Sequence, residues 1–283
     1  MKHGKICPKA TSRLEATSRP KVTPHPQRYS LLIAYDGTAY AGWQVQPNQR
    51  TIQSELEAAL RRLAGASVKL HGSGRTDQGV HAAGQVAHCD LPFVMPADNL
   101  ARALNALLPV DIRILRAQPV GAAFHARRSA VRKEYRYYIW NGDVISPFLR
   151  LYRTHVRAPL DVRPMRQAAA LLVGRHDFAA FSANPNREVA STRRRVMKLT
   201  VSRKDHEIMI RAQSDGFLYK MVRSLAGFLI RVGEGAVPPE EALRILHSKI
   251  RTARVPTAPP QGLFLWRVWY PNKKIQNPSS KFQ

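Results

Sequence analysis

The sequence predicts an α+β fold in which helices pack against a mostly antiparallel sheet. Two observations predict it. Short apolar runs of strand length follow one another in hairpin-like succession, and stretches with helical spacing of apolar residues separate them. The chain has 283 residues, of which 44% are apolar, so it can bury a sizeable core.

In the N-terminal half, apolar runs predict strands over residues 29–34, 68–71, 85–90 and 112–120. Ile52 opens a helical period directly after Thr51, a residue type that favours the N-cap position. A second helix is expected around Leu100 and Leu104, and Pro109 ends it.

In the C-terminal half, the same patterns predict strands over residues 131–140, 196–201, 208–212 and 263–270. They predict helices over residues 162–172, 218–232 and 239–247. We place a boundary near 121–133, which divides the body of the chain into subdomains 29–126 and 127–271.

Both ends of the chain differ in composition from its body. Residues 1–28 hold seven basic residues, one acid and four prolines, and residues 272–283 hold three basic residues and no acid. Residues 1–28 lack the apolar segment of a secretory signal. We therefore expect 1–28 and 272–283 to be disordered basic tails.

The balance of charges is strongly positive. Lys and Arg number 45 against 19 Asp and Glu, which gives a net charge of +26. Of this, +6 lies in residues 1–28 and +3 in residues 272–283, which leaves +17 on the body of the chain. Such a body repels itself unless a polyanion binds it. Nucleic acid is the first candidate partner, and an anionic membrane surface is the second.

Several classes of protein are excluded by composition. No apolar stretch approaches the ~18 residues of a membrane span. Two cysteines, Cys7 and Cys89, cannot build a disulfide framework or a four-cysteine zinc site, and the histidines lack the spacing of zinc enzymes. We expect a soluble protein of a reducing compartment that binds no metal.

The segment from His71 to His81 carries the most information about chemistry. Three glycines in eight residues allow a ligand to approach the backbone closely, and the segment fits neither a phosphate loop nor a dinucleotide fingerprint. It places Asp77 two residues from Arg75. A carboxylate beside a guanidinium stays ionised, which suits a nucleophile or an electrostatic stabiliser. The alternative is a purely structural Arg–Asp turn.

Three further segments are rich in basic residues. Five basic residues between positions 127 and 136 are interleaved with aromatics, a pattern that suits phosphate contacts and base stacking or, alternatively, a solvated edge strand. On a strand, Lys133 and Tyr135 would share one face. Lys220 and Arg223 are three residues apart on an otherwise apolar helix, and residues 193–195 form an arginine run that is either an RNA contact or solvated.

Together these segments resemble the tRNA pseudouridine synthase A (TruA) family from about Tyr29 to Tyr270. The resemblance rests on motifs in family-like order: Tyr35-Asp36-Gly37-Thr38, Gly42-Trp43-Gln44, residues 74–81, Phe124-His125-Ala126-Arg127, Tyr135-Arg136-Tyr137, His176-Asp177-Phe178, Phe217-Leu218 with Met221-Val222-Arg223, and Gly262-Leu263. Two positions depart from it: Gln78 stands where many members have Ala, and Pro260 where many have a small residue.

The resemblance implies the pseudouridine synthase fold, with two similar α/β subdomains around a basic cleft. It implies a cytoplasmic homodimer, without cofactor or metal, that isomerises uridine to pseudouridine at positions 38–40 of the tRNA anticodon stem-loop. The target base is flipped out of the stem, because its glycosidic bond is unreachable inside the stack.

The resemblance also implies roles for individual residues. Asp77 is expected to be the nucleophile, which attacks either uracil C6 or ribose C1′. Arg75 is expected to help extrude the target nucleotide or to fill its place, and Arg223 to pair with the Asp77 carboxylate. The residues expected to bind the substrate are Tyr135, which stacks on the flipped uracil and assists a proton transfer, Leu263, which closes an apolar wall, and Phe217, Lys220, Arg127 and Lys133.

The main alternative from another class is a non-catalytic tRNA-binding protein that uses the same basic cleft. A hydrolase that uses Asp77 is less favoured, since that chemistry usually needs a second carboxylate or a metal.

Overall fold

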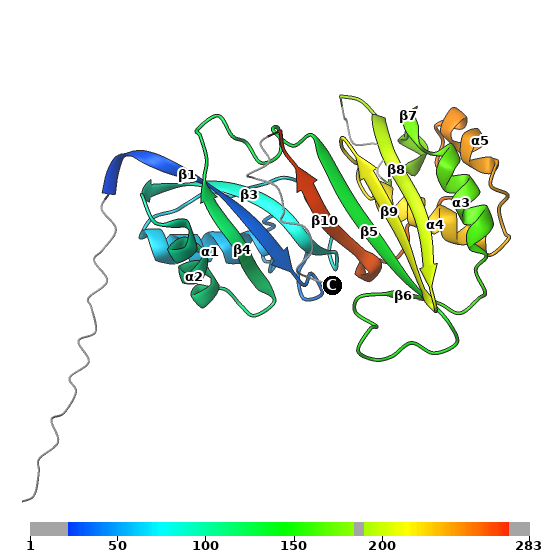
Figure 1. Cartoon of the computed structure of the whole chain (residues 1–283), viewed down its shortest axis with the longest axis horizontal. Helices are drawn as coiled ribbons and strands as arrows, with labels where there is room; N and C mark the ends of the chain where they lie inside the picture. The colour runs from blue at the N-terminus through cyan, green and yellow to red at the C-terminus, as the bar shows by residue number, and fades with distance from the viewer. Residues whose placement is uncertain (1–21, 184–189, 272–283) are drawn as a thin grey trace, which may run out of the picture.

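The computed structural model describes residues 22–183 and 190–271, and the strands of these residues form one ten-stranded sheet (Figure 1). The strand order is β4-β1-β3-β10-β5-β9-β8-β7, with β2 paired to β3 and β6 paired to β5. Among the strand pairs of the described residues, only β3–β10 and β5–β6 are parallel. The predicted α+β class with a mostly antiparallel sheet is confirmed.

The N-terminal half follows the predicted order of strands and helices. Its elements are β1 (Val22–Tyr35), α1 (Ile52–Ala64), β2 (His71–Gly72), β3 (His81–Phe93), α2 (Ala97–Leu107) and β4 (Ile112–Pro119). Thr51 caps α1 as predicted: its side chain accepts from the Ser54 amide while the Ser54 hydroxyl accepts from the Thr51 amide. Figure 1 shows α1 and α2 beside this part of the sheet.

The C-terminal half contains β5 (Arg132–Asn141), β6 (Thr154–Val156), α3 (Val162–Leu171), β7 (Gly174–Asp177), β8 (Arg193–Lys204), β9 (Glu207–Ser214), α4 (Met221–Gly233), α5 (Glu241–Ser248) and β10 (Leu263–Trp269). The predicted strands and helices of this half are present. The short strands β6 and β7 were not predicted, because three or four residues are too few to give an alternation pattern.

The structure moves two predicted boundaries. The strand β1 begins at Val22, so residues 22–28 of the expected N-terminal tail belong to the sheet, and Arg28 binds Asp90 of β3 at 2.7 Å. Residues 1–21 and the C-terminal tail 272–283 lie outside the described residues. The helix predicted from residue 218 begins at Met221, because Lys220 has a left-handed backbone with φ of 55°.

The strand predicted over residues 68–71 is reduced to the two residues of β2. Side chains of α1 take the backbone groups that a strand would have used: Glu57 accepts from the Leu70 amide at 3.0 Å, and Gln53 donates to the Leu70 carbonyl at 3.1 Å. Leu70 is nevertheless buried, which explains its apolar character.

The parallel pairing of β3 with β10 joins the two expected subdomains into one sheet. Phe264 pairs with His81 and Leu265 with Ala82, so both strands begin at the same edge. On its other side β10 pairs antiparallel with β5, which places Leu265 opposite Tyr135. The segment that precedes β3, the start of β10 and the middle of β5 therefore meet in one region.

In the described part of the chain, no helix combines the length and the apolar character needed to span a lipid bilayer.

Helix α4 packs against a chain segment at a distance that only glycine allows. A Cβ atom at Gly227 would lie 2.1 Å from the Pro256 carbonyl oxygen. The same segment holds the helix through Ala258, whose amide donates to the Arg223 carbonyl at 3.0 Å. The spacing between α4 and residues 256–258 thus sets the position of Arg223.

We predict that Gly227→Ala lowers the free energy of unfolding by at least about 2 kcal/mol, because overpacking against backbone forces the helix to move. Urea denaturation of the variant and the parent protein measures this. Gly121→Ala is the control, since nothing lies within 4 Å of its new methyl group. Equal stability of Gly227→Ala and the parent would contradict the prediction.

Candidate active site

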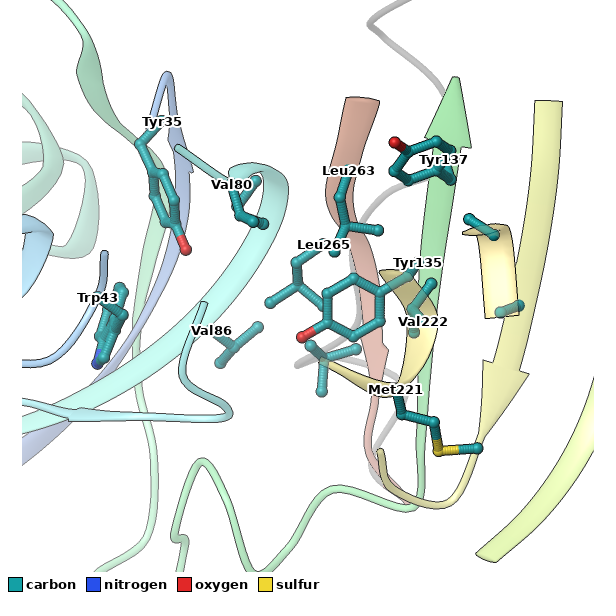
Figure 2. Packing of buried hydrophobic residues seen from close by; sticks show 14 of the residues in the cluster. Tyr35, Trp43, Val80, Val86, Tyr135, Tyr137, Met221, Val222, Leu263 and Leu265 are labelled. Carbon is teal, nitrogen blue, oxygen red and sulfur yellow. The ribbon is translucent and has the colours of Figure 1, made fainter. Parts of the chain in front are cut away.

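The two halves of the molecule line a groove of about 2310 Å³. Figure 2 shows four of the lining residues, with Trp43 and Val80 on one side and Tyr135 and Leu263 on the other. The groove is lined by all nine residues for which the resemblance implied a catalytic or binding role, namely Arg75, Asp77, Arg127, Lys133, Tyr135, Phe217, Lys220, Arg223 and Leu263.

Residues 73–80, called the 73–80 loop below, connect β2 to β3 and are fixed by hydrogen bonds at several points. The Ser73 amide donates to the Val86 carbonyl at 2.7 Å. Buried Gln85 accepts from the Ser73 hydroxyl and donates to the Gly74 carbonyl at 2.8 Å. These bonds hold the first part of the loop against β3.

Thr76 anchors the second part of the same loop. Its carbonyl accepts from the Trp43 amide at 3.0 Å, and its hydroxyl lies 2.8 Å from the Tyr35 hydroxyl. Gly42 permits this approach, since its φ is +100° and a Cβ there would lie 2.7 Å from the Thr76 carbonyl oxygen. The Gly-Trp pair that the sequence singled out therefore supports the turn that carries Asp77.

Asp77 forms an ion pair with Arg223 across the groove. The Asp77 Oδ2 atom accepts from Arg223 Nη1 at 3.0 Å, and the side chains are 21% and 12% exposed. Arg223 Nε donates to the Ala258 carbonyl at 2.8 Å, so the guanidinium is held at two points. The second oxygen of Asp77 accepts no hydrogen bond from any residue of 22–183 or 190–271.

Tyr135 lies in the apolar part of the groove. Its ring meets the Phe217 ring edge-on, with centroids 5.1 Å apart, and only 8% of the residue is exposed. Burial raises the pKa of Tyr135 well above its usual value, and the charge of Asp77 contributes to the increase. The hydroxyl is therefore protonated at neutral pH and can donate a hydrogen bond. Leu263, also buried, begins the neighbouring strand.

Lys133 is a half-buried cation that holds the start of the 73–80 loop. Its Nζ atom donates to the Ser73 carbonyl at 2.6 Å. A Cβ at Gly74 would lie 3.4 Å from Lys133 Nζ and 4.0 Å from the Tyr135 hydroxyl, so both side chains border this glycine. Burial lowers the pKa of Lys133 to about 8, and the positive charge of Arg127 adds to the effect.

Arg75 and Arg127 are exposed on the groove, and neither side chain forms a hydrogen bond or an ion pair with a described residue.

The groove as a whole carries a positive charge. Among its described residues the acids are Glu57 and Asp77, whereas the basic residues are Lys69, Arg75, Arg127, Lys133, Arg194, Lys220, Arg223, Lys249 and Arg251. A surface of this charge attracts phosphate groups.

Sequence reasoning missed part of this basic lining. Lys69, Lys249 and Arg251 were not singled out, because they stand outside any motif and only the fold brings them to the groove. Of the arginine run 193–195, Arg194 lines the groove. Within the described residues, no group of three His, Cys, Asp or Glu side chains is arranged to hold a metal ion.

A family model described as tRNA pseudouridine synthase matches residues 31–127 and 168–271. The chain belongs to the tRNA pseudouridine synthase family. It is therefore an isomerase that acts in tRNA modification. Seven of the nine predicted site residues lie inside the matched ranges, and Lys133 and Tyr135 lie between them.

Individual members of the tRNA pseudouridine synthase family are similar along most of the chain. It is 44% identical over 252 residues to tRNA pseudouridine synthase A of Halalkalibacterium halodurans, which covers 89% of this chain and 95% of the relative. It is 45% identical over 244 residues to the protein of the same name from an Exiguobacterium species, which covers 86% and 98%. The TruA resemblance inferred from the motifs is confirmed.

The lowered pKa of Lys133 predicts a pH dependence of stability in this synthase. Between pH 8 and about 10.5 the unfolded lysine keeps a proton that the folded lysine has lost. The free energy of unfolding should therefore rise with pH in this range, by at most about 1.4 kcal/mol per pH unit.

Denaturant unfolding at pH 7.5, 8.5 and 9.5 measures this contribution as the difference between the parent protein and Lys133→Met. The subtraction cancels other groups that titrate in the same range. A difference that stays constant with pH would contradict the prediction.

Proposed function

We propose that this protein converts uridine to pseudouridine at positions 38–40 of tRNA, in the anticodon stem-loop, with Asp77 as the nucleophile. The ion pair of Asp77 with Arg223 at the base of a basic groove is the observation that supports this function most directly. The arginine partner orients the carboxylate, and its second oxygen is left available for attack.

The reaction rearranges one bond without a net change in atoms. The N1–C1′ bond of uridine breaks, a C5–C1′ bond forms, the C5 proton leaves, and N1 gains a proton. Asp77 either adds to C6 of the uracil or displaces the base from C1′, and in both cases the carboxylate is released at the end. Because the product is an isomer of the substrate, we propose no cofactor and no metal.

The target base must leave the stem before Asp77 can reach it, at a cost of a few kcal/mol. Tyr135 would stack on the flipped uracil and recover roughly 1–3 kcal/mol, and its protonated hydroxyl would donate a hydrogen bond. Phe217 supports the Tyr135 ring, and Leu263 would close an apolar wall that keeps water from the detached base. Arg75, exposed beside Asp77, would extrude the nucleotide or take its place.

The basic side chains around this pocket would bind the RNA backbone. Arg127 and Lys220 line the groove without an acidic partner among the described residues, so their charges are available to phosphates. Lys133 would contact the substrate from beside Tyr135 while it holds the 73–80 loop. We place the protein in the cytoplasm as a homodimer, with tRNA as its substrate.

We predict that the parent protein releases tritium from an unmodified tRNA transcript labelled at C5 of uridine, and that Asp77→Asn does not. Pseudouridine formation must lose this hydrogen, so the assay follows the reaction itself. Asp77→Asn keeps the shape of the side chain and removes its charge. We expect the variant to retain tRNA binding in a filter-binding measurement.

The same pair of measurements tests the non-catalytic alternative. Tight binding by the parent protein without tritium release would favour a tRNA-binding protein and overturn the proposed function. Release at the parent's rate by Asp77→Asn would leave the reaction in place but remove Asp77 as its nucleophile.

We predict that Arg75→Ala separates catalysis from binding. The Arg75 side chain would contribute a few kcal/mol to flipping the nucleotide. Its loss should therefore lower kcat/KM roughly 100-fold, while the Kd for tRNA changes much less. Single-turnover rates and filter binding measure the two quantities, with Arg62→Ala, an exposed arginine of α1 outside the groove, as the control. Parallel losses in rate and affinity would make Arg75 an ordinary phosphate contact.

A further inference from the structure

Tyr219 and Lys220 are neighbouring residues in the wall of the groove. Their side-chain contacts within the protein do not explain why they are there. They lie in the short segment between Phe217, which supports Tyr135, and Arg223, which holds Asp77. Both line the groove.

Tyr219 presents an aromatic ring to the groove. It is 42% exposed, whereas Leu218 and Met221 on either side of the pair are buried. Its backbone is fixed, because its carbonyl accepts from the Ala183 amide at 3.2 Å. Its hydroxyl makes no hydrogen bond with any other described residue. The backbone that carries the ring is therefore anchored, while the ring itself is partly exposed to the groove.

Lys220 adopts a backbone conformation that L-residues rarely take. Its φ is 55° and its ψ is 11°, where glycine or asparagine fits with less strain. It precedes α4 without a side-chain cap, and no carboxylate of the described residues pairs with it. Its Nζ atom lies 4.9 Å from the centroid of the Tyr219 ring. A strained backbone conformation at a residue whose side chain makes no stabilising hydrogen bond or ion pair is typical of functional sites.

We propose that Tyr219 and Lys220 form a binding subsite for the nucleotide next to the target uridine. The base of this nucleotide stacks on the Tyr219 ring, and its phosphate binds the Lys220 ammonium. This inference rests on the proposed function and extends it to a second nucleotide.

The physical reason lies in what base flipping does to the RNA. When the target base leaves the stack, its neighbour loses a stacking partner, and an aromatic ring near the pocket replaces it. The ammonium of Lys220 now lies over the Tyr219 ring, a contact worth little at an exposed site. An arriving base takes the ring face, and the ammonium moves to the phosphate that arrives with it.

The test uses a stem-loop RNA with an unmodified target uridine and the same RNA with abasic sites beside the target. Binding is measured in the Asp77→Asn background, so that no turnover intervenes. We expect Tyr219→Ala to weaken binding of the intact RNA about tenfold and Tyr219→Phe to preserve it. With the abasic RNA, Tyr219→Ala should have no effect, because the stacking partner is already absent.

Lys220→Gly provides a second variant that does not disturb the fold. Glycine accepts the left-handed backbone, so the free energy of unfolding should stay the same or rise. The variant should lose one phosphate contact with the RNA. The slope of the logarithm of the binding constant against the logarithm of the salt concentration should therefore become less negative by about 0.7. Asp205→Gly, at another left-handed position outside the groove, is the matched control and should leave binding unchanged.

The outcomes separate this subsite from the proposed function. Tritium release by the parent protein on the intact stem-loop is measured first, and its absence overturns the proposed function. With release present, equal affinities of Tyr219→Ala and the parent for the intact RNA overturn the subsite alone. An unchanged salt slope in Lys220→Gly overturns its phosphate contact. An effect of Tyr219→Ala that persists on the abasic RNA also overturns the stacking role.

Discussion

The ion pair between Asp77 and Arg223 connects the two halves of the molecule at the base of the groove. Its partners are 146 residues apart in the chain, one in the 73–80 loop and the other in the first turn of α4. Both side chains are mostly withdrawn from water, so loss of either would leave the other charge poorly solvated. The supports described above, from Trp43 on one side and from Ala258 on the other, all set the geometry of this one pair.

The pairing of β3 with β10 makes this meeting possible. A strand from the end of the chain inserts between two strands of its earlier parts, and the resulting sheet carries both walls of the groove. Because β10 runs parallel to β3 and antiparallel to β5, Leu263, Tyr135 and the 73–80 loop converge without any loop having to reach across. Pocket residues on a continuous sheet are held more rigidly than pocket residues on loops.

Several groups near the pocket lower the stability of the folded protein. Lys133 is half-buried without a carboxylate partner among the described residues, Lys220 has a left-handed backbone, and the groove holds many cations and few acids. Such violations of local rules cluster where a protein binds or reacts. In this protein a polyanionic substrate would relieve the repulsion, and the groove is the place where it would bind.

Patterns in the sequence were enough to predict the fold class, nearly all of the helices and strands, the capping residue of α1 and the family. They were enough because periodicity, caps and contiguous motifs are local properties of a chain. The nine residues to which the sequence assigned a catalytic or binding role all line the groove, although their roles stay proposals. Tertiary structure alone decided that Thr76 is held by Trp43, that Lys133 binds the Ser73 carbonyl, and that Lys69, Lys249 and Arg251 join the basic lining. These contacts depend on strand order and on close approach between distant segments, and no pattern within a single segment records them.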